Sequence, residues 1–103
     1  MVNLYDETLQ ALNDINKEMS DIKYIVCGFQ EIKNMVTVFD VNYDNGWGGN
    51  EIPLSLSIVF EDGTWLERAE YDGSEWWTYK SPPVLEENAE EFSGDLRWVT
   101  NDN

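Results

Sequence analysis

The sequence predicts an α+β fold: an antiparallel sheet of about four to six strands, with an N-terminal amphipathic helix packed on one face and a short acidic C-terminal helix. Three observations predict this class. Apolar residues recur at helical spacing near the N-terminus, they alternate along the middle of the chain, and Asp-Gly pairs separate the alternating segments. Because 103 residues is the size of one domain, we expect a single compact domain over residues 1–103.

The N-terminal helix is expected from about Asp6 to Ser20. Apolar residues at steps of three and four place one stripe on this helix, formed by Leu9, Leu12, Ile15, Met19 and Ile22. Asp6 is the expected N-cap, and Glu7 favours the positive end of the helix dipole.

Two strands are expected after this helix. Residues 24–30 are rich in β-branched and aromatic types, which are typical of strands. A second strand is predicted over residues 35–43 by apolar residues on alternate positions, namely Met35, Phe39, Val41 and Tyr43.

Residues 54–60 predict a half-buried strand that leads into a tight hairpin. Apolar residues at every second position, Leu54, Leu56, Ile58 and Phe60, give this strand an inner face. The pair Asp62-Gly63 favours a two-residue type I′ turn, which requires positive φ at both central residues. Such a turn places Phe60 opposite Trp65.

This expected register decides which side chains of the next strand face the core. It puts Arg68 and Glu70 on the outer face of the sheet. It also points Glu67 inward, opposite Ile58, which is unfavourable for a carboxylate. A bulge or a longer loop would relieve this conflict, and the sequence leaves that choice open.

A further turn is predicted at Asp72-Gly73-Ser74, followed by a strand over residues 75–80. Neighbouring residues of a strand point to opposite faces, so Trp76 and Trp77 cannot both be buried on the same side. We expect Trp76 to be the exposed one.

A short acidic helix is expected after Ser81-Pro82-Pro83, because proline breaks a sheet and is favoured in the first turn of a helix. Its apolar face is formed by Leu85, Ala89 and Phe92. Its acidic face is formed by Glu86, Glu87, Glu90 and Glu91. Gly94 ends this helix, and residues 96–100 are expected to add a last strand.

The charge of the chain narrows the classes of partner. It has 21 Asp and Glu, 6 Lys and Arg and no His, which gives a net charge of −15. Solubility requires only about 2 to 8 net charges in a small domain. The surplus repels nucleic acid and anionic membranes and attracts basic protein surfaces, so we expect no direct binding to nucleic acid or to a membrane.

Enzyme classes are disfavoured by the same composition. Without His there is no ordinary catalytic triad and no histidine metal site. The single Cys27 lies in an apolar segment, where a thiolate is unfavourable, and it excludes an internal disulfide. We expect a non-enzymatic protein without a cofactor. No apolar leader or long apolar run is present, which predicts a cytoplasmic location.

The chain resembles a class of small acidic inhibitors from phages and mobile elements. These inhibitors mimic DNA and block restriction enzymes, uracil-DNA glycosylase or CRISPR effectors. The resemblance covers size, charge, the lack of cysteine pairs and the helix-plus-sheet layout, and it includes no shared motif. It implies an inhibitor that occupies the nucleic-acid-binding groove of a bacterial defence or repair enzyme. The expected partner-binding residues are Glu61, Asp62, Glu67, Glu70, Asp72, Glu75, Trp76, Glu86, Glu87, Glu90 and Glu91.

A calcium loop is a separate hypothesis for residues 40–51. Oxygen-bearing side chains stand at positions 1, 3, 5 and 12 of an EF-hand-like spacing, at Asp40, Asn42, Asp44 and Glu51. An EF-hand requires helices on both sides, whereas strands are expected here. The competing interpretation is an Asn- and Gly-rich connection between two strands.

The alternative function is an acidic protein-interaction module, or a phage regulatory protein, that binds some other protein surface. Carbohydrate binding is a further alternative, because aromatic side chains on a small sheet form stacking platforms, and the candidates are Trp47, Trp65, Trp76, Trp77 and Trp98. The sequence leaves the identity of the target and the oligomeric state open.

Overall fold

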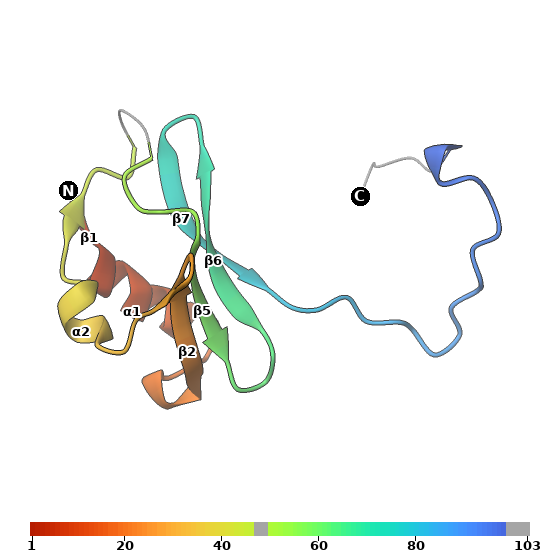
Figure 1. The fold of residues 1–103 in the computed structure, drawn as a ribbon, viewed down its shortest axis with the longest axis horizontal. Coiled ribbons are helices and arrows are strands. Elements are labelled where there is room, and N and C mark those ends of the chain that lie inside the picture. The colour runs from red at the N-terminus through yellow and green to blue at the C-terminus, as the bar shows by residue number, and fades with distance from the viewer. Residues whose placement is uncertain (47–49, 99–103) are drawn as a thin grey trace.

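Two helices pack against one side of an antiparallel sheet in the computed structural model, which describes residues 1–46 and 50–98 (Figure 1). The helical elements are α1 (Leu4–Asp14), the 3₁₀ turn η1 (Met19–Asp21), α2 (Met35–Val38) and the 3₁₀ turn η2 (Leu96–Trp98). The strands are β1 (Val2–Asn3), β2 (Ile22–Cys27), β3 (Gln30–Glu31), β4 (Asn42–Tyr43), β5 (Leu56–Phe60), β6 (Trp65–Tyr71) and β7 (Ser74–Lys80).

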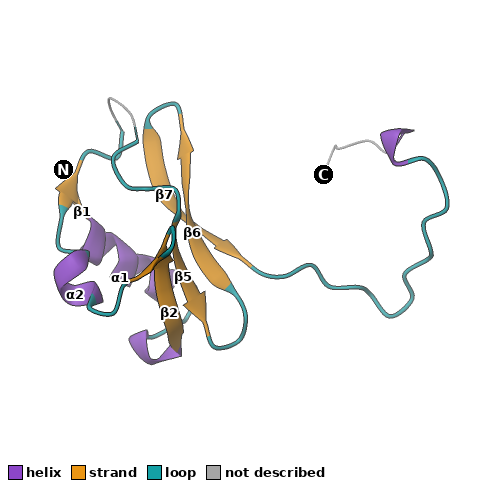
Figure 2. Ribbon diagram, in the orientation of Figure 1, coloured by secondary structure: helices purple, strands orange, loops and turns teal. Residues whose placement is uncertain are grey.

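The main sheet has five strands in the order β3-β2-β5-β6-β7, and all neighbouring strands are antiparallel. A separate two-stranded sheet pairs β1 with β4. Figure 2 shows α1 and α2 on the same side of the main sheet. The predicted α+β class, with an N-terminal helix on one face of an antiparallel sheet, is therefore confirmed.

The hydrophobic core lies between the main sheet and these two helices. Its most deeply buried apolar side chains are Phe39, which directly follows α2, Ile58 and Phe60 of β5, and Leu66 of β6. Leu4 and Leu12 of α1 and Ile25 of β2 complete the same cluster. Burial of this apolar area provides the main favourable term in folding.

Helix α1 begins earlier and ends earlier than the sequence pattern predicted. Asn3 is the N-cap, since its side-chain oxygen accepts a hydrogen bond from the amide of Asp6 at 3.1 Å. Asp6, the expected N-cap, lies inside the first turn. The helix ends at Asp14 because Asn16 adopts a left-handed conformation with a φ of 56°.

The buried stripe of α1 also differs from the expected one. Its buried residues are Leu4, Thr8 and Leu12, whereas Leu9 is exposed. Met19 and Ile22 belong to η1 and β2 and not to this helix. At 11 residues, α1 is the longest helix in the described ranges, and none of these helices has the length and apolar character needed to cross a membrane.

The strand predicted over residues 35–43 was wrong for its first part. Residues Met35 to Val38 form helix α2, which Asn34 caps by accepting a hydrogen bond from the amide of Thr37 at 3.2 Å. Met35 and Phe39 are both buried and lie four residues apart, which is the spacing of one helix face. Met35 and Phe39 fit both the two-residue period of a strand and the spacing of a helix face, and the Asn34 cap favours the helix.

The β5–β6 hairpin has a longer loop than predicted, and this shifts its register by one residue. Gly63 has a φ of 86°, and its amide donates to the carbonyl of Phe60 at 3.0 Å. Trp65 pairs with Val59 and not with Phe60. The three-residue loop therefore replaces the expected type I′ turn.

A one-residue shift moves every side chain of β6 to the other face of the sheet. Leu66 and Arg68 point to the core side and are buried, whereas Glu67 lies opposite Ser57 on the other side. The expectation that Arg68 is outside and Glu67 inside was therefore wrong. The structure resolves the open choice in favour of the longer loop.

The β6–β7 turn agrees with the prediction. Asp72 and Gly73 have φ angles of 52° and 86°, and Tyr71 pairs with Ser74 across them. Positive φ at both central residues defines a two-residue hairpin turn, so Ser74, expected in the turn, is the first residue of β7.

The C-terminal tail, residues 81–98, contains no α-helix. All side chains from 81 to 97 are exposed, and the tail runs away from the sheet (Figure 1). The predicted C-terminal helix was wrong, because the tail meets no surface that could bury its apolar stripe, and short isolated helices are marginal in water. Residues 96–98 form η2 in place of the first part of the expected last strand, and residues 99 and 100 lie outside the described ranges.

Candidate functional site

The hairpin carboxylates expected to bind a partner lie at opposite ends of β6. Glu61 and Asp62 are in the β5–β6 loop, whereas Glu70 and Asp72 are at the β6–β7 turn. β6 has seven residues, so these pairs are separated by about 20 Å at roughly 3.3 Å per residue. The structure brings together the members of each pair, but it does not bring the two pairs into one acidic face.

Asp62 already has a cation beside it within the chain. The ammonium of Lys17 lies 2.5 Å from the Oδ2 atom of Asp62. The hydrogen bond from Lys17 holds the pKa of Asp62 well below its usual range, and the same contact raises the pKa of Lys17. Both charges are retained at neutral pH, so Asp62 offers less unbalanced charge to a partner than Glu61 does.

Glu75 is not available to a partner, which removes it from the expected binding set. Its side chain is fully buried, and its two oxygens accept hydrogen bonds from the backbone amides of Glu51 and Ile52, at 2.6 Å and 3.0 Å. Glu75 therefore fixes the connection between β4 and β5 to the edge strand β7.

A buried ionic cluster on the core side of the sheet was not predicted. Arg68 donates to the Oε2 atom of Glu7 at 3.2 Å and to the hydroxyl of Tyr43 at 2.8 Å, and it lies 3.7 Å from Glu75. Its guanidinium also lies over the rings of Trp77 and Tyr43, at 4.8 Å and 5.6 Å from their centroids. Such stacking on aromatic faces is favourable for a guanidinium.

Arg68 was missed because the expected register placed it outside. The unfavourable inward position of Glu67 was the signal that could have revealed the shift. Glu7 and Tyr43 come from α1 and β4, so this cluster joins three parts of the chain and has a structural role. Tyr43 donates its hydroxyl proton to Glu7, and burial together with this bond raises the pKa of Tyr43 to about 12.

The four glutamates of the C-terminal tail are exposed, but they are not in a row at helical spacing. Glu86, Glu87, Glu90 and Glu91 lie in an irregular segment with one local turn, in which the amide of Ala89 donates to the carbonyl of Glu86 at 3.1 Å. They are the largest group of neighbouring carboxylates without a basic side chain between them in the described tail.

The proposed calcium ligands do not converge. Asp40 and Asn42 both accept hydrogen bonds from the side chain of Asn3, at 3.0 Å and 3.1 Å. Glu51 accepts from the backbone amide of Asp44 at 2.6 Å. No group of three or more acidic, histidine or cysteine side chains suited to a metal ion occurs within residues 1–46 and 50–98, and residues 47–49 of the proposed loop lie outside these ranges.

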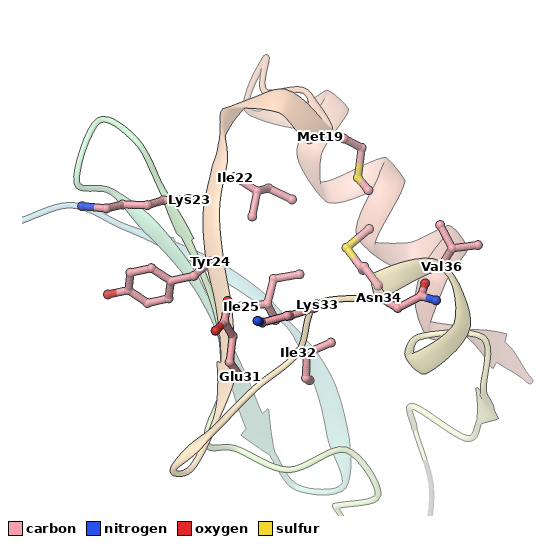
Figure 3. Close-up of a pocket in the computed structure, with 11 residues that line it drawn as sticks. Met19, Ile22, Lys23, Tyr24, Ile25, Glu31, Ile32, Lys33, Asn34 and Val36 are labelled. Carbon is pink, nitrogen blue, oxygen red and sulfur yellow. The ribbon is translucent and has the colours of Figure 1, made fainter.

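A pocket with a volume of about 580 Å³ lies between β2, η1 and α2 (Figure 3). Its lining is mainly apolar and includes Met19, Ile22, Ile25, Ile32 and Met35. Lys23 and Tyr24 extend from the other side of β2 (Figure 3). The charged side chains of its lining are Lys23, Glu31 and Lys33.

The sheet face opposite α1 is the second accessible feature. Trp76 is 41% exposed there, whereas Trp77 lies on the core side and donates to the hydroxyl of Thr8 at 2.9 Å. The expected difference between these two neighbours is therefore confirmed. Trp47 lies outside the described residues.

Comparisons with known proteins add no family to this picture. No protein-family model matches the chain, and no similar curated protein or solved structure was found.

Proposed function

We propose that this protein is a non-enzymatic acidic inhibitor that occupies the nucleic-acid-binding groove of a bacterial defence or repair enzyme, such as an anti-CRISPR or anti-restriction DNA mimic. The observation that carries the proposal is the uncompensated charge of the exposed surface. Carboxylates without internal counterions attract a basic surface, and they do so most strongly at low salt.

The internal ion pairs of the described residues leave most of this charge unbalanced. Three basic side chains are used internally, where Lys17 pairs with Asp62, Arg97 pairs with Asp95, and Arg68 is buried between two glutamates. The chain has 21 acidic residues in total, so few of them have a cation beside them. A partner surface rich in Lys and Arg would supply the missing counterions.

The C-terminal tail supports the same proposal. Residues Glu86 to Glu91 contain four exposed carboxylates in an irregular segment. Duplex DNA also presents a dense run of negative charge, with one phosphate per roughly 3.4 Å of helix axis on each strand. The tail therefore offers a local concentration of negative charge to a phosphate-binding groove.

A second candidate function is an acidic protein-interaction module that binds a different kind of protein surface. The separation of the hairpin carboxylates at the two ends of β6 favours it, because a rigid imitation of duplex DNA requires charges on one continuous face. The two functions differ in one measurable respect, which is whether DNA and this protein compete for the same partner.

The test is competitive release of a captured partner. The immobilised protein is incubated with bacterial lysate at low salt and is then washed with duplex DNA or with NaCl of equal ionic strength. The proposal expects DNA to release a nucleic-acid-binding enzyme that the matched NaCl wash retains. Retention of every bound protein during the DNA wash would contradict the inhibitor and would favour the interaction module.

A pair of charge-matched variants tests the contribution of the tail. The substitutions Glu86→Lys and Glu87→Lys should weaken capture of the same enzyme, whereas Asp6→Lys with Asp14→Lys changes the net charge equally at exposed positions of α1, outside the proposed site. Equal loss in both variants would show that only total charge matters. Far-UV circular dichroism verifies that both variants keep the fold.

A further inference from the structure

The face of the main sheet that points away from α1 and α2, which we term the open face, carries large aromatic side chains. One row across the strands consists of Tyr24, Val59, Trp65 and Lys80, because these residues are cross-strand partners. Trp76 and Tyr71 lie further along the same face, where Trp76 is opposite Ala69. Its other members are Val26, Ser57, Glu67, Ala69, Ser74 and Thr78, together with Glu31 at the β3 edge.

No described helix covers this face. Figure 2 shows α1 and α2 on the other side of the sheet, and the tail runs away from it. The exposed fractions are 40% for Tyr24, 41% for Trp76 and 76% for Tyr71. A group of exposed aromatic side chains on an uncovered sheet is typical of an interaction surface.

A single carboxylate lies in the middle of the open face. Glu67 is two residues from Trp65 on β6, and its Oε1 atom accepts a hydrogen bond from the indole nitrogen of Trp65 at 2.8 Å. Its diagonal neighbours on β7 are Trp76 and Lys80, since Glu67 pairs with Thr78. No ion pair joins Lys80 to Glu67 within the described residues. The other carboxylate oxygen, Oε2, has no hydrogen bond from any described residue.

We infer that the open face binds an arginine side chain of a basic partner protein, with the guanidinium stacked on Trp76 or Trp65 and paired with Glu67. This inference rests on the proposed function, since it assigns the contact that a basic enzyme groove makes with this protein. A guanidinium matches both components of the surface, because it stacks on aromatic rings and donates two parallel hydrogen bonds to a carboxylate.

Charge complementarity selects this occupant over the others. A second copy of the chain would bring another Glu67 and another net charge of −15 to the same place, which repels it. The acidic tail is disfavoured for the same reason. A neutral sugar would stack on the aromatic rings, but it would form no ion pair with the central carboxylate.

The experiment measures binding of two matched peptides, N-acetyl-(Gly-Arg)₃-amide and N-acetyl-(Gly-Lys)₃-amide, to the full chain at near-physiological salt. Amide chemical shifts locate the site and tryptophan fluorescence gives the affinity. We expect the arginine peptide to bind several-fold more tightly than the lysine peptide, with shifts concentrated on β6 and β7. The variant Glu67→Gln, which retains an acceptor for Trp65, should weaken the arginine peptide by about tenfold.

The matched control is Asp14→Asn, which removes one exposed charge from α1, on the other side of the sheet, and leaves the open face unchanged. Its effect should stay within about twofold, as for other exposed charges. Equal losses in the two variants, equal binding of the two peptides, or shifts spread over the whole acidic surface would each overturn the inference. Shifts of the open face that appear on concentration without peptide, or with maltohexaose, would assign the face to a second copy or a sugar and would also overturn it.

The outcome is separable from that of the proposed function. Peptide binding does not involve nucleic acid, whereas the proposed function depends on competition with DNA. If DNA releases a captured enzyme but Glu67→Gln binds the arginine peptide like the parent, the open face is excluded and the inhibitor stands. If Glu67→Gln binds the arginine peptide more weakly than the parent but DNA releases no captured protein, the arginine site stands and the interaction module is favoured.

Discussion

Arg68 shows how a buried charge can organise a small acidic domain. Its guanidinium is enclosed, and it contacts Glu7 of α1, Tyr43 of β4 and Glu75 of β7. Its Nε atom is the one buried side-chain polar atom of the described residues without a hydrogen-bond partner. Burying charges is costly even when they are paired, so the cluster specifies which elements meet more than it adds net stability.

Removing the Arg68 cation should lower the free energy of unfolding by much more than its ion pairs add to it. We predict that Arg68→Met lowers the free energy of unfolding by about 3 to 5 kcal/mol, because it leaves Glu7 and Glu75 without their counterion. Urea denaturation measures this loss. Arg97→Ala is the control, since Arg97 is exposed and pairs only with Asp95, and its melting temperature should match that of the parent. An Arg68→Met variant as stable as the parent would show that the cluster is dispensable.

Tyr43 gives the protein a specific alkaline sensitivity. Burial and the bond to Glu7 raise its pKa from 10.0 to about 12 in the folded state, so the folded protein holds the phenol proton more tightly than the unfolded chain. Its stabilising contribution is complete below pH 10 and is lost as the pH rises towards 12. We predict that Tyr43→Phe reduces the fall in unfolding free energy over this range, measured by urea denaturation.

Comparing the parent with the Tyr43→Phe variant separates the contribution of Tyr43 from that of other groups that titrate at alkaline pH. Lys17 also has a raised pKa and so also loses stabilisation at alkaline pH, but it does so in both the parent and the variant. Parallel curves for parent and Tyr43→Phe above pH 10 would contradict the assignment.

At the scale of elements, the cap of α1 connects two parts of the fold. Asn3 caps the helix through Asp6 and also donates to Asp40 and Asn42. We predict that Asn3→Ala lowers the free energy of unfolding by about 1 kcal/mol or more, and that Asp6→Ala, at the cap position expected from sequence, has a smaller effect. Thermal or urea denaturation of the two variants measures the difference. A larger loss for Asp6→Ala would restore the helix boundary predicted from sequence.

The sequence predicted the elements whose local signals agree with one another. Strand β5 and the turn at Asp72-Gly73 were found because alternation and positive-φ residues indicate the same structure. Residues 35–38 were assigned wrongly because Met35 and Phe39 satisfy a strand period and a helix period equally. Here the deciding contact is the Asn34 cap, which the alternation does not show.

The candidate site was less predictable than the fold because it depends on register and on tertiary contacts. One extra loop residue before Trp65 moved Arg68 inside and Glu67 outside. Glu75 was expected on the surface, although its partners are backbone amides more than twenty residues away in sequence. Strand alternation correctly predicted that Trp76 and Trp77 point to opposite faces, and Trp76, the first candidate for the exposed one, is 41% exposed.

At the scale of the whole molecule, the net charge of −15 should limit stability through self-repulsion. Salt screens this repulsion, with a Debye length of about 10 Å at 0.1 M ionic strength. Since the tail runs away from the sheet (Figure 1), charges on residues 1–80 repel one another more strongly than they repel those of the tail. The two groups of carboxylates should therefore contribute unequally to the salt dependence of stability.

We predict that the melting temperature rises with NaCl, measured by circular dichroism from about 0.02 to 0.5 M. Neutralising the tail with Glu86→Gln, Glu87→Gln, Glu90→Gln and Glu91→Gln should leave most of this rise in place. Neutralising four carboxylates of the folded part, with Asp14→Asn, Glu31→Gln, Glu61→Gln and Glu67→Gln, should reduce the rise more, although the change in net charge is the same. A melting temperature that falls steadily with NaCl would exclude self-repulsion as the limit on stability. If the melting temperatures of the two variants rose equally with NaCl, the tail charges would destabilise the folded part as strongly as the charges of the folded part itself.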